Sequence, residues 1–228
     1  MTRRLGVLGG TFDPVHFGHL DAAAAARSAF ALHRVLFVPS HDPPHRPDEP
    51  HATAFHRLAL VALAINGIAA YRVSDLELLR HGRSYTSDTL RVLHASGWAP
   101  SQLFFILGAD AFAEIATWHE FPGVLDAANF AVIARPGTTI ESALARTPAL
   151  QSRARPAAAA LEAGSRTGIF IVEAATRDVS STMIRQRLAA RQPLGDLVPS
   201  AVERHIAVHH LYGTESNLHG HDEDNQNS

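Results

Sequence analysis

Short apolar runs alternate with amphipathic segments along most of this chain. Each run indicates a strand that is buried on both faces, as strands are in a parallel sheet. The intervening segments carry helix-start residues or an apolar face at helical spacing. Strands that alternate with helices predict an α/β fold with a doubly wound, mainly parallel, Rossmann-like sheet. The strands that we expect cover residues 5–8, 34–39, 71–74, 103–107, 130–134 and 169–172.

Helix signals fill the intervals between these runs. An Ala-rich helix is expected over 18–30. Thr53 can begin the next helix by accepting a backbone N–H at its N-cap. The apolar face expected for that helix is Leu58, Val61, Ala62 and Ile65. Later helices are expected from 87 or 88 to about 94 and up to about 115. A small helical C-terminal part is expected over 180–191 and 199–209.

A length of 228 residues indicates one domain, which we expect to cover residues 1–212. A hydrophobic content of 46% is sufficient for a full core. Residues 147–168 are low in complexity and rich in Ala, Arg and Ser, so they indicate a surface insertion. Residues 213–228 are polar and partly acidic, and we expect them to be a disordered tail.

Composition excludes several classes of site. A net charge of −2 argues against a nucleic-acid or membrane surface. The absence of cysteine excludes disulfides, thiolate metal sites and cysteine nucleophiles. No signal-peptide pattern and no membrane-length apolar run occurs, so we expect a cytoplasmic protein. Nothing in the sequence indicates an oligomeric state.

The chain contains no lysine, so all 20 of its Lys and Arg positions are arginine. This excludes a Walker-type lysine, Schiff-base chemistry and a lysine general base. Any stabilisation of negative charge must therefore come from arginine, histidine, backbone amides or a metal ion.

The segment from Gly9 to His19 joins the first expected strand to the first helix. Its glycines permit close approach of backbone N–H groups, and a helix N-terminus favours an anion such as phosphate. His16 and His19 are three residues apart at the helix start, so both imidazoles can face one point. The glycine spacing is not G-x-G-x-x-G, which disfavours a nicotinamide-dependent oxidoreductase.

A second cluster of donors lies near the C-terminus, from Ser180 to Arg185. Hydroxyl groups at a helix start, with an arginine one turn later, can hold a triphosphate. Other polar motifs follow expected strands directly, at 40–46, at 108–110 and at Arg135. Because ligands of doubly wound sheets bind at the carboxyl ends of the strands, these motifs are expected to form one site.

The segments 9–19 and 180–185 resemble the two signatures of the nucleotidyltransferase superfamily with the HxGH motif. Within it, residues 5–212 are most similar to the bacterial nicotinate-nucleotide adenylyltransferase family. The resemblance implies adenylyl transfer from ATP to nicotinate mononucleotide, which yields nicotinate adenine dinucleotide (deamido-NAD) and pyrophosphate for NAD biosynthesis. It implies Mg²⁺ as cofactor, held mainly by the phosphates of ATP rather than by protein ligands.

The resemblance also assigns roles in the ATP half of the site. His16 and His19 would stabilise the transition state, and Arg46 and Arg185 would hold phosphates during catalysis. Arg46 stands where the family carries a lysine, so a planar guanidinium replaces a point charge. The implied ATP and phosphate contacts are Gly9, Gly10, Thr11, Phe12, His16, His19, Arg135, Ser181, Thr182 and Arg185.

In the other half of the site, Trp118 would stack on the pyridine ring. Thr86 and backbone N–H groups around His119 would hold the nicotinate carboxylate, although tyrosine is frequent in the family at the position of His119. Asp110 would accept hydrogen bonds from the ribose hydroxyls. The implied contacts of the pyridine mononucleotide are His45, Arg46, Thr86, Gly108, Asp110, Trp118 and His119.

Two alternatives stay open at this point. The same reaction could prefer nicotinamide mononucleotide, or the chain could be a nucleotide-binding sensor without turnover. Pantetheine-phosphate and glycerol- or choline-phosphate transferases share the first motif but would not need Trp118 and the segment 84–86. The presence of both histidines favours the enzyme over the sensor.

Overall fold

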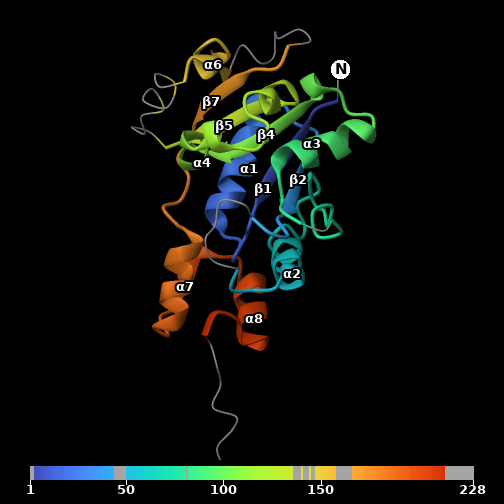
Figure 1. The fold of residues 1–228 in the computed structure, drawn as a ribbon. Helices are drawn as coiled ribbons and strands as arrows, with labels where there is room; N and C mark the ends of the chain where they lie inside the picture. The colour runs from blue at the N-terminus through green and yellow to red at the C-terminus, as the bar shows by residue number, and fades with distance from the viewer. Residues whose placement is uncertain are drawn as a thin grey trace, which may run out of the picture.

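A computed structural model describes residues 3–43, 50–80, 82–135, 140, 144, 147–157 and 166–213, and all structural statements below concern these residues. They form one seven-stranded sheet with helices on both faces (Figure 1). The strand order is β3-β2-β1-β4-β5-β7-β6, and every neighbouring pair is parallel. The predicted doubly wound sheet is confirmed.

The centre of the sheet consists of β1 (Leu5–Gly10), β2 (Arg34–Pro39), β4 (Leu103–Gly108) and β5 (Asn129–Ala134). Their apolar side chains are almost all buried, which is the environment that their sequences predict. β1 lies between β2 and β4. The chain order therefore reverses beside β1, and the crevice for a ligand is expected there.

The outer strands are β3 (Tyr71–Val73), β7 (Ile169–Glu173) and β6 (Ala154–Pro156). The sequence predicted β3 and β7 but not β6, which lies in the range expected to be a surface insertion. β6 pairs with β7 at the edge of the sheet, after the short helix α6 (Pro148–Gln151). A three-residue strand that contains arginine and proline is acceptable at an edge, and its pattern is too short to recognise in sequence.

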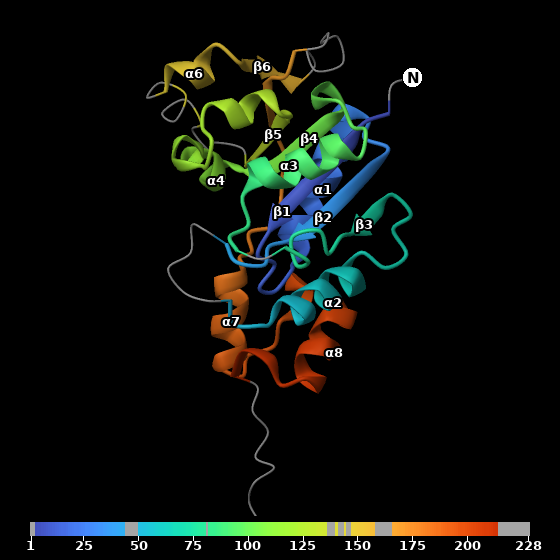
Figure 2. The ribbon, with the colours of Figure 1, turned by 45° about the vertical axis from the view of Figure 1, so that its right-hand side comes forward.

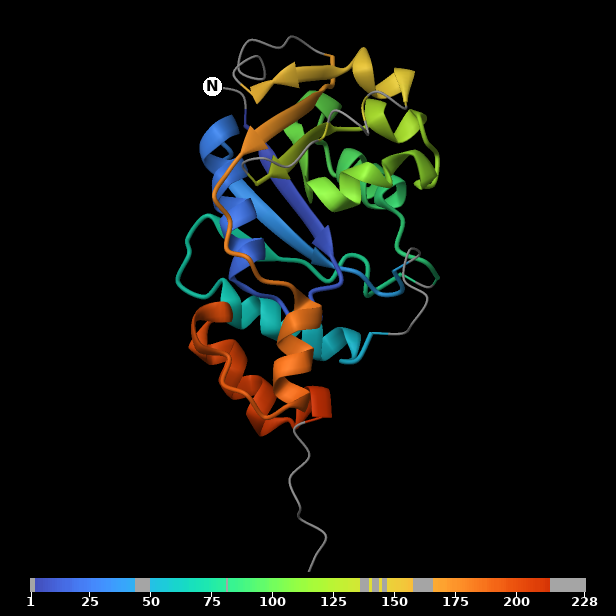
Figure 3. The same ribbon diagram turned by 90° about the vertical axis from the view of Figure 1, so that its left-hand side faces the viewer.

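The two faces of the sheet are covered by different helices. On one face, α1 (Phe17–Phe30) packs its Phe30 against Phe104 and Phe170. On the other face, α3 (Thr86–Ala95) and α4 (Ala109–Ala113) bury apolar side chains against β4 and β5. Figure 2 shows α3 in front of the sheet, and Figure 3 shows α1 along its opposite side.

Three helices gather beyond the carboxyl end of β1: α2 (Ala54–Ala64), α7 (Ser181–Ala189) and α8 (Ser200–Val208) (Figure 1). α7 and α8 form the small helical C-terminal part that the sequence predicted. Thr53 caps α2 as expected, since its hydroxyl accepts the backbone N–H of His56 at 3.4 Å. The tail expected to be disordered lies, beyond Gly213, outside the described residues. No helix in the described part of the chain is both long and apolar enough to cross a membrane.

The buried face of α2 differs from the predicted one. Of the predicted positions, Val61 and Ile65 are buried, whereas Leu58 is half-buried and Ala62 is exposed. The helix buries Arg57, Leu60 and Ala64 as well. Arg57, a charged residue that the expected apolar face did not include, is only 1% exposed. A buried charge needs hydrogen-bond partners, and those of Arg57 belong to the site described next.

Candidate functional site

A cleft of about 690 Å³ opens at the carboxyl ends of β1, β4 and β5. It extends from the turn between β1 and α1 to the start of α7 on one side and to the start of α3 on the other. Most of the residues expected to bind nucleotide line this one cleft. They are Gly9, Gly10, Thr11, His16, His19, Thr86, Gly108, Asp110, Trp118, Arg135, Ser181 and Thr182.

The turn after β1 owes its shape to small residues. A Cβ atom at Gly9 would lie 3.2 Å from the ring of Phe105. A Cβ atom at Gly18 would lie 3.1 Å from Nδ1 of His16 and 3.2 Å from Val179. Both contacts are tighter than side chains normally make, so glycine allows β1 and the start of α1 to approach their neighbours. Gly18, the third residue of the HxGH motif, makes room for the first histidine.

His16 is a neutral imidazole at the start of α1. Burial, together with the positive charge of Arg135, lowers the pKa of His16 to about 4. Its Nδ1 atom is buried and has no hydrogen-bond partner among the described residues. Because buried polar atoms are normally paired, this atom is suited to a ligand or to water.

The ring of His19 lies beside that of His16, with 3.7 Å between the ring centroids. Nδ1 of His19 accepts the backbone N–H of His16 at 3.2 Å. An acceptor Nδ1 carries no proton, so neutral His19 has its proton on Nε2. The backbone thus fixes a tautomer in which Nε2 is a hydrogen-bond donor.

The start of α7 is joined directly to the first motif. The Ser181 hydroxyl donates to the Pro14 carbonyl at 2.9 Å. Arg185 donates to the Asp13 carbonyl at 2.8 Å and to the Thr182 hydroxyl at 3.2 Å. Segments that are far apart in sequence therefore form one wall of the cleft. Arg185 itself lines an adjoining pocket of about 460 Å³, which it shares with Thr182.

Phe12 was expected to contact ATP, but its side chain does not line the cleft. Its side chain is 1% exposed and packs in the core, with its ring 6.0 Å from that of Phe37 and 5.0 Å from that of His19. The structure therefore gives the ring of Phe12 a packing position behind His19 rather than a place in the cleft. Sequence could not separate these two uses of an aromatic residue within a motif.

Gly108 and Asp110 lie where β4 passes into α4, and Arg135 follows β5. Arg135 is held by the segment after β7: it donates to the Asp178 carboxylate at 2.5 Å and to the Thr176 hydroxyl at 3.4 Å. Its guanidinium therefore has a defined place at the edge of the cleft.

The segments expected to hold the pyridine nucleotide differ in whether their side chains line the cleft. Trp118 lines the cleft and meets Phe105 edge-to-face, with ring centroids 5.8 Å apart. The side chain of His119 does not line it, because its ring stacks on Tyr85 at 4.2 Å and its Nδ1 lies 3.3 Å from the Ser87 hydroxyl. His45 and Arg46 fall outside the described residues, although the preceding Ser40 and Pro43 line the cleft.

Two buried charged groups behind the cleft were not singled out from the sequence. The Asp13 carboxylate is fully buried and accepts the backbone N–H groups of His51 and Ala52 at 2.9 and 3.1 Å. Arg57 donates to the carbonyls of Thr11 at 2.8 Å and Ser40 at 2.7 Å. Arg57 thus ties the loop after β1 to the loop after β2. In the sequence, the burial of Arg57 could have been inferred from its helical spacing to the apolar residues Leu60, Val61 and Ala64.

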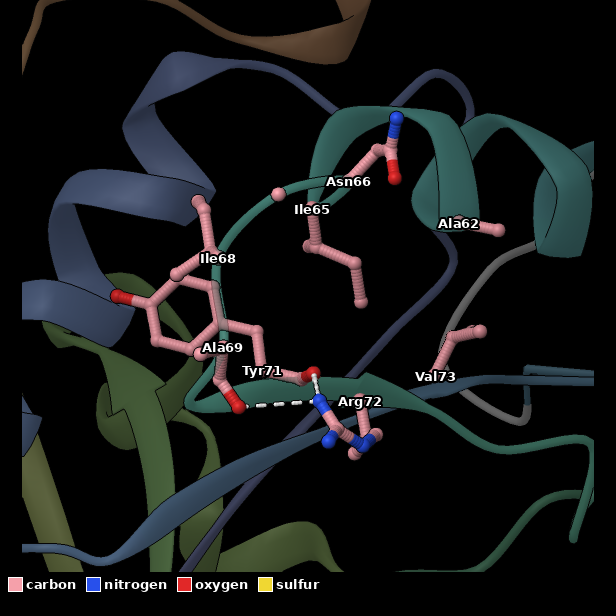
Figure 4. A pocket seen from close by; sticks show the side chains of 9 residues that line it. Ala62, Ile65, Asn66, Ile68, Ala69, Tyr71, Arg72 and Val73 are labelled. Atoms are coloured by element: carbon pink, nitrogen blue, oxygen red, sulfur yellow. Dashed lines mark hydrogen bonds between the residues drawn. The ribbon is translucent and has the colours of Figure 1, made fainter.

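A third charged residue, Glu77, is also buried and lines the cleft directly. A separate pocket of about 410 Å³ lies away from all these residues, between the end of α2 and β3 (Figure 4). Its arginine, Arg72, is turned back onto the carbonyls of Ala69 and Tyr71. None of the motif residues lines that pocket, so the large cleft is the candidate site.

Known proteins are similar to this chain over most of its length. A family model described as cytidylyltransferase-like matches residues 7–187. A protein of Citrifermentans bemidjiense named "Probable nicotinate-nucleotide adenylyltransferase" is 39% identical over 212 residues, which are 92% of this chain and 98% of the relative. A protein of Pseudomonas syringae pv. tomato with the same name is 42% identical over 212 residues, 93% of this chain and 95% of the relative.

Among solved structures, the chain is similar to Plasmodium falciparum nicotinic acid mononucleotide adenylyltransferase complexed with NaAD. The TM-score is 0.68 at 19% identity, and the match covers 92% of this chain and 98% of the other. The same protein complexed with APC gives a TM-score of 0.66 at 17% identity. At these identities the likeness concerns the fold, which is the one predicted.

Proposed function

Since the chain belongs to the cytidylyltransferase-like family, we infer that it is an enzyme that transfers the adenylyl group of ATP to nicotinate mononucleotide. The products are nicotinate adenine dinucleotide and pyrophosphate, in NAD biosynthesis. Relatives that align over nearly their whole length carry this activity in their names. The structural observation that carries the inference is the meeting of His16 and His19 with Ser181 and Thr182 in one cleft.

The reaction needs no protein base. The nucleophile is the phosphate oxygen of the mononucleotide, which is already ionised at neutral pH. It attacks the α-phosphorus of ATP, the bond to the β-phosphate oxygen breaks, and pyrophosphate leaves with that electron pair. What the protein supplies is positioning and stabilisation of negative charge.

In this proposal the two imidazoles act as neutral hydrogen-bond donors rather than as cations. The Nε2–H of His19 has its tautomer fixed by the backbone of His16. His16 is neutral because of its burial. Neutral donors that are held in place stabilise charge that develops at the α-phosphate without reorganising during the reaction.

We assign the β- and γ-phosphates of ATP to the start of α7. Ser181 and Thr182 line the cleft at a helix N-terminus, where backbone N–H groups and the helix dipole favour an anion. Arg185 follows one turn later, and Arg46 would approach from the loop after β2.

The described residues contain no group of three or more His, Cys, Asp or Glu side chains that could hold a metal ion. A magnesium ion bound with ATP would accordingly take most of its ligands from phosphates and water. When bound, it would neutralise charge on the β- and γ-phosphates.

We place the pyridine mononucleotide on the opposite side of the cleft. Trp118 offers the face of its ring for stacking. Thr86 at the start of α3 and the backbone near His119 would hold the carboxylate, while Asp110 would accept hydrogen bonds from the ribose. His119 contributes through its backbone in this arrangement, since its side chain is stacked on Tyr85.

Product analysis tests the proposal. The protein is incubated with ATP, Mg²⁺ and nicotinate mononucleotide, and the mixture is examined by mass spectrometry. We expect nicotinate adenine dinucleotide and an equal amount of pyrophosphate. Binding of ATP without either product would contradict the enzyme and favour the nucleotide-binding sensor.

A further inference from the structure

Glu77 is a buried carboxylate at the mononucleotide side of the cleft. It lies between β3 and α3, its residue is 7% exposed, and it lines the cleft together with Ser84 and Thr86. A carboxylate in such a place is costly unless hydrogen-bond donors surround it. The hydrogen-bond partners of Glu77 therefore indicate its role.

Two hydroxyl groups supply these donors. Thr89, in the first turns of α3, donates to Oε1 of Glu77 at 2.5 Å. The Ser84 hydroxyl is the second group, and it lowers the pKa of this carboxyl. Burial raises the pKa of Glu77, and the hydrogen bonds from Thr89 and Ser84 act against that rise by favouring the ionised form.

Ser84 extends the network to the loop after β2. Its hydroxyl accepts the backbone N–H of His41 at 2.9 Å, and its own backbone N–H donates to the Asp42 carbonyl at 2.8 Å. A hydroxyl can accept one hydrogen bond and donate another at the same time. Ser84 thus ties residues 41 and 42 to the segment that leads into α3.

Two walls of the cleft meet beside Glu77, which lines it together with Ser84 and Thr86. One wall is the loop after β2, which leads to His45 and Arg46. The other is the start of α3, which carries Thr86. The start of α3 belongs to the half of the cleft that we assign to the pyridine mononucleotide. The hydrogen bonds of Thr89 and Ser84 lead to Glu77 and to residues 41 and 42, not to α7 or the HxGH motif.

We propose that Glu77 is a positioning residue for the mononucleotide half of the cleft, holding Ser84 and Thr89 so that the loop after β2 and the start of α3 keep the spacing that the substrate requires. The proposal rests on the proposed function. It deepens that function by naming a determinant of affinity for the mononucleotide that is distinct from the residues expected to touch it.

The first test replaces Glu77 with glutamine. E77Q keeps the volume and one acceptor oxygen but removes the charge and the second acceptor. We expect the KM for nicotinate mononucleotide to rise about tenfold or more, since hydrogen bonds to a charged group are among the stronger ones. The KM for ATP should rise clearly less than that for the mononucleotide, because the donors at α7 and the HxGH motif are untouched and Arg46 alone would reach ATP from the loop after β2.

A matched pair at Thr89 separates the hydrogen bond from packing. T89V has nearly the shape of threonine but no hydroxyl, whereas T89S keeps the hydroxyl. T89V should raise the KM for the mononucleotide and leave that for ATP near the wild-type value, and T89S should behave like the wild type. This pair carries the test even where E77Q fails to fold.

Three results would overturn the role of Glu77. They are an unchanged mononucleotide KM in both E77Q and T89V, an equal rise in both substrates' KM values, or a fall in the mononucleotide KM. The last result would mean that the carboxylate repels the substrate directly. The wild-type protein is assayed in parallel: absence of turnover there contradicts the proposed function, whereas wild-type turnover with unchanged variants contradicts only the positioning role.

Discussion

At the scale of single residues, the role proposed for the two imidazoles depends on how the fold holds them. His16 is neutral because it is buried beside a positive charge, and His19 is held by a backbone N–H. The sequence predicted both histidines from their spacing at a helix start. It could not predict their protonation, since burial and the neighbourhood of Arg135 arise only from the folded chain.

The lowered pKa of His16 has a consequence for stability. The folded pKa is about 4, below the ordinary value of 6.5, so the unfolded chain binds more protons between these two values. Stability is therefore fully present above about pH 6.5 and falls as the pH drops toward 4, by up to about 3 kcal/mol from this residue. Urea unfolding at pH 7 and pH 4.5 measures this loss. H16Q should lose clearly less stability than the wild type over the same interval, and an equal loss would contradict the account.

The donor role of His19 gives a second expectation. H19A removes a fixed hydrogen-bond donor at the reacting phosphate and should reduce kcat about 100-fold or more. Steady-state kinetics measure this, with circular dichroism to verify the fold. H209A is the matched control, because His209 is an exposed histidine directly after α8 and does not line the cleft. A kcat for H19A close to that of H209A would remove His19 from the mechanism.

At the scale of elements, strands and helix starts were predicted well wherever the pattern was long. The central strands are continuous apolar runs, and α7 begins at the hydroxyl cluster as expected, with Ser180 accepting the backbone N–H of Met183 at 3.1 Å. The failures have physical causes. β6 is too short for a pattern, and the buried face of α2 contains Arg57, whose partners are carbonyls of loops that sequence alone cannot position.

Arg57 should contribute strongly to the stability of the loops that it joins. R57M keeps much of the side-chain length but leaves the carbonyls of Thr11 and Ser40 without these donors in a buried place. We expect a loss of about 3 kcal/mol or more in the free energy of unfolding. Urea unfolding at pH 7 measures the loss. R204M, at an exposed position of α8, should change the free energy of unfolding by less than about 0.5 kcal/mol. Similar losses in R57M and R204M would contradict the role of Arg57 in joining the two loops.

At the scale of the whole molecule, the parallel sheet explains why distant motifs meet. All seven strands point the same way, so the segments after β1, β4, β5 and β7 arrive at one edge. The hydrogen bonds from Ser181 to Pro14 and from Arg185 to Asp13 then join the two ends of the fold. The cleft lies at the carboxyl ends of the strands, where the alternation of strands and helices placed it. The charges behind it, Asp13, Arg57 and Glu77, were not predicted, because their partners are mostly backbone groups and hydroxyls.

The joining of these segments predicts stabilisation by ligand. A dinucleotide product that contacts both the HxGH motif and α7 binds only the folded chain, so it should raise the free energy of unfolding. The gain at a concentration 100 times the Kd is about 2.7 kcal/mol. Thermal unfolding with increasing nicotinate adenine dinucleotide measures it, and a Tm that does not depend on ligand concentration would contradict the shared site.

The most direct measurement is the rate of pyrophosphate release from ATP with each of the two pyridine mononucleotides at equal concentration. The account predicts rapid release with nicotinate mononucleotide and a kcat/KM about tenfold or more lower with nicotinamide mononucleotide, because a site built to hold a carboxylate loses those bonds with the amide. Equal values would retain the chemistry and contradict the nicotinate preference. Release with neither mononucleotide would contradict the central claim that this cleft transfers an adenylyl group to a pyridine nucleotide.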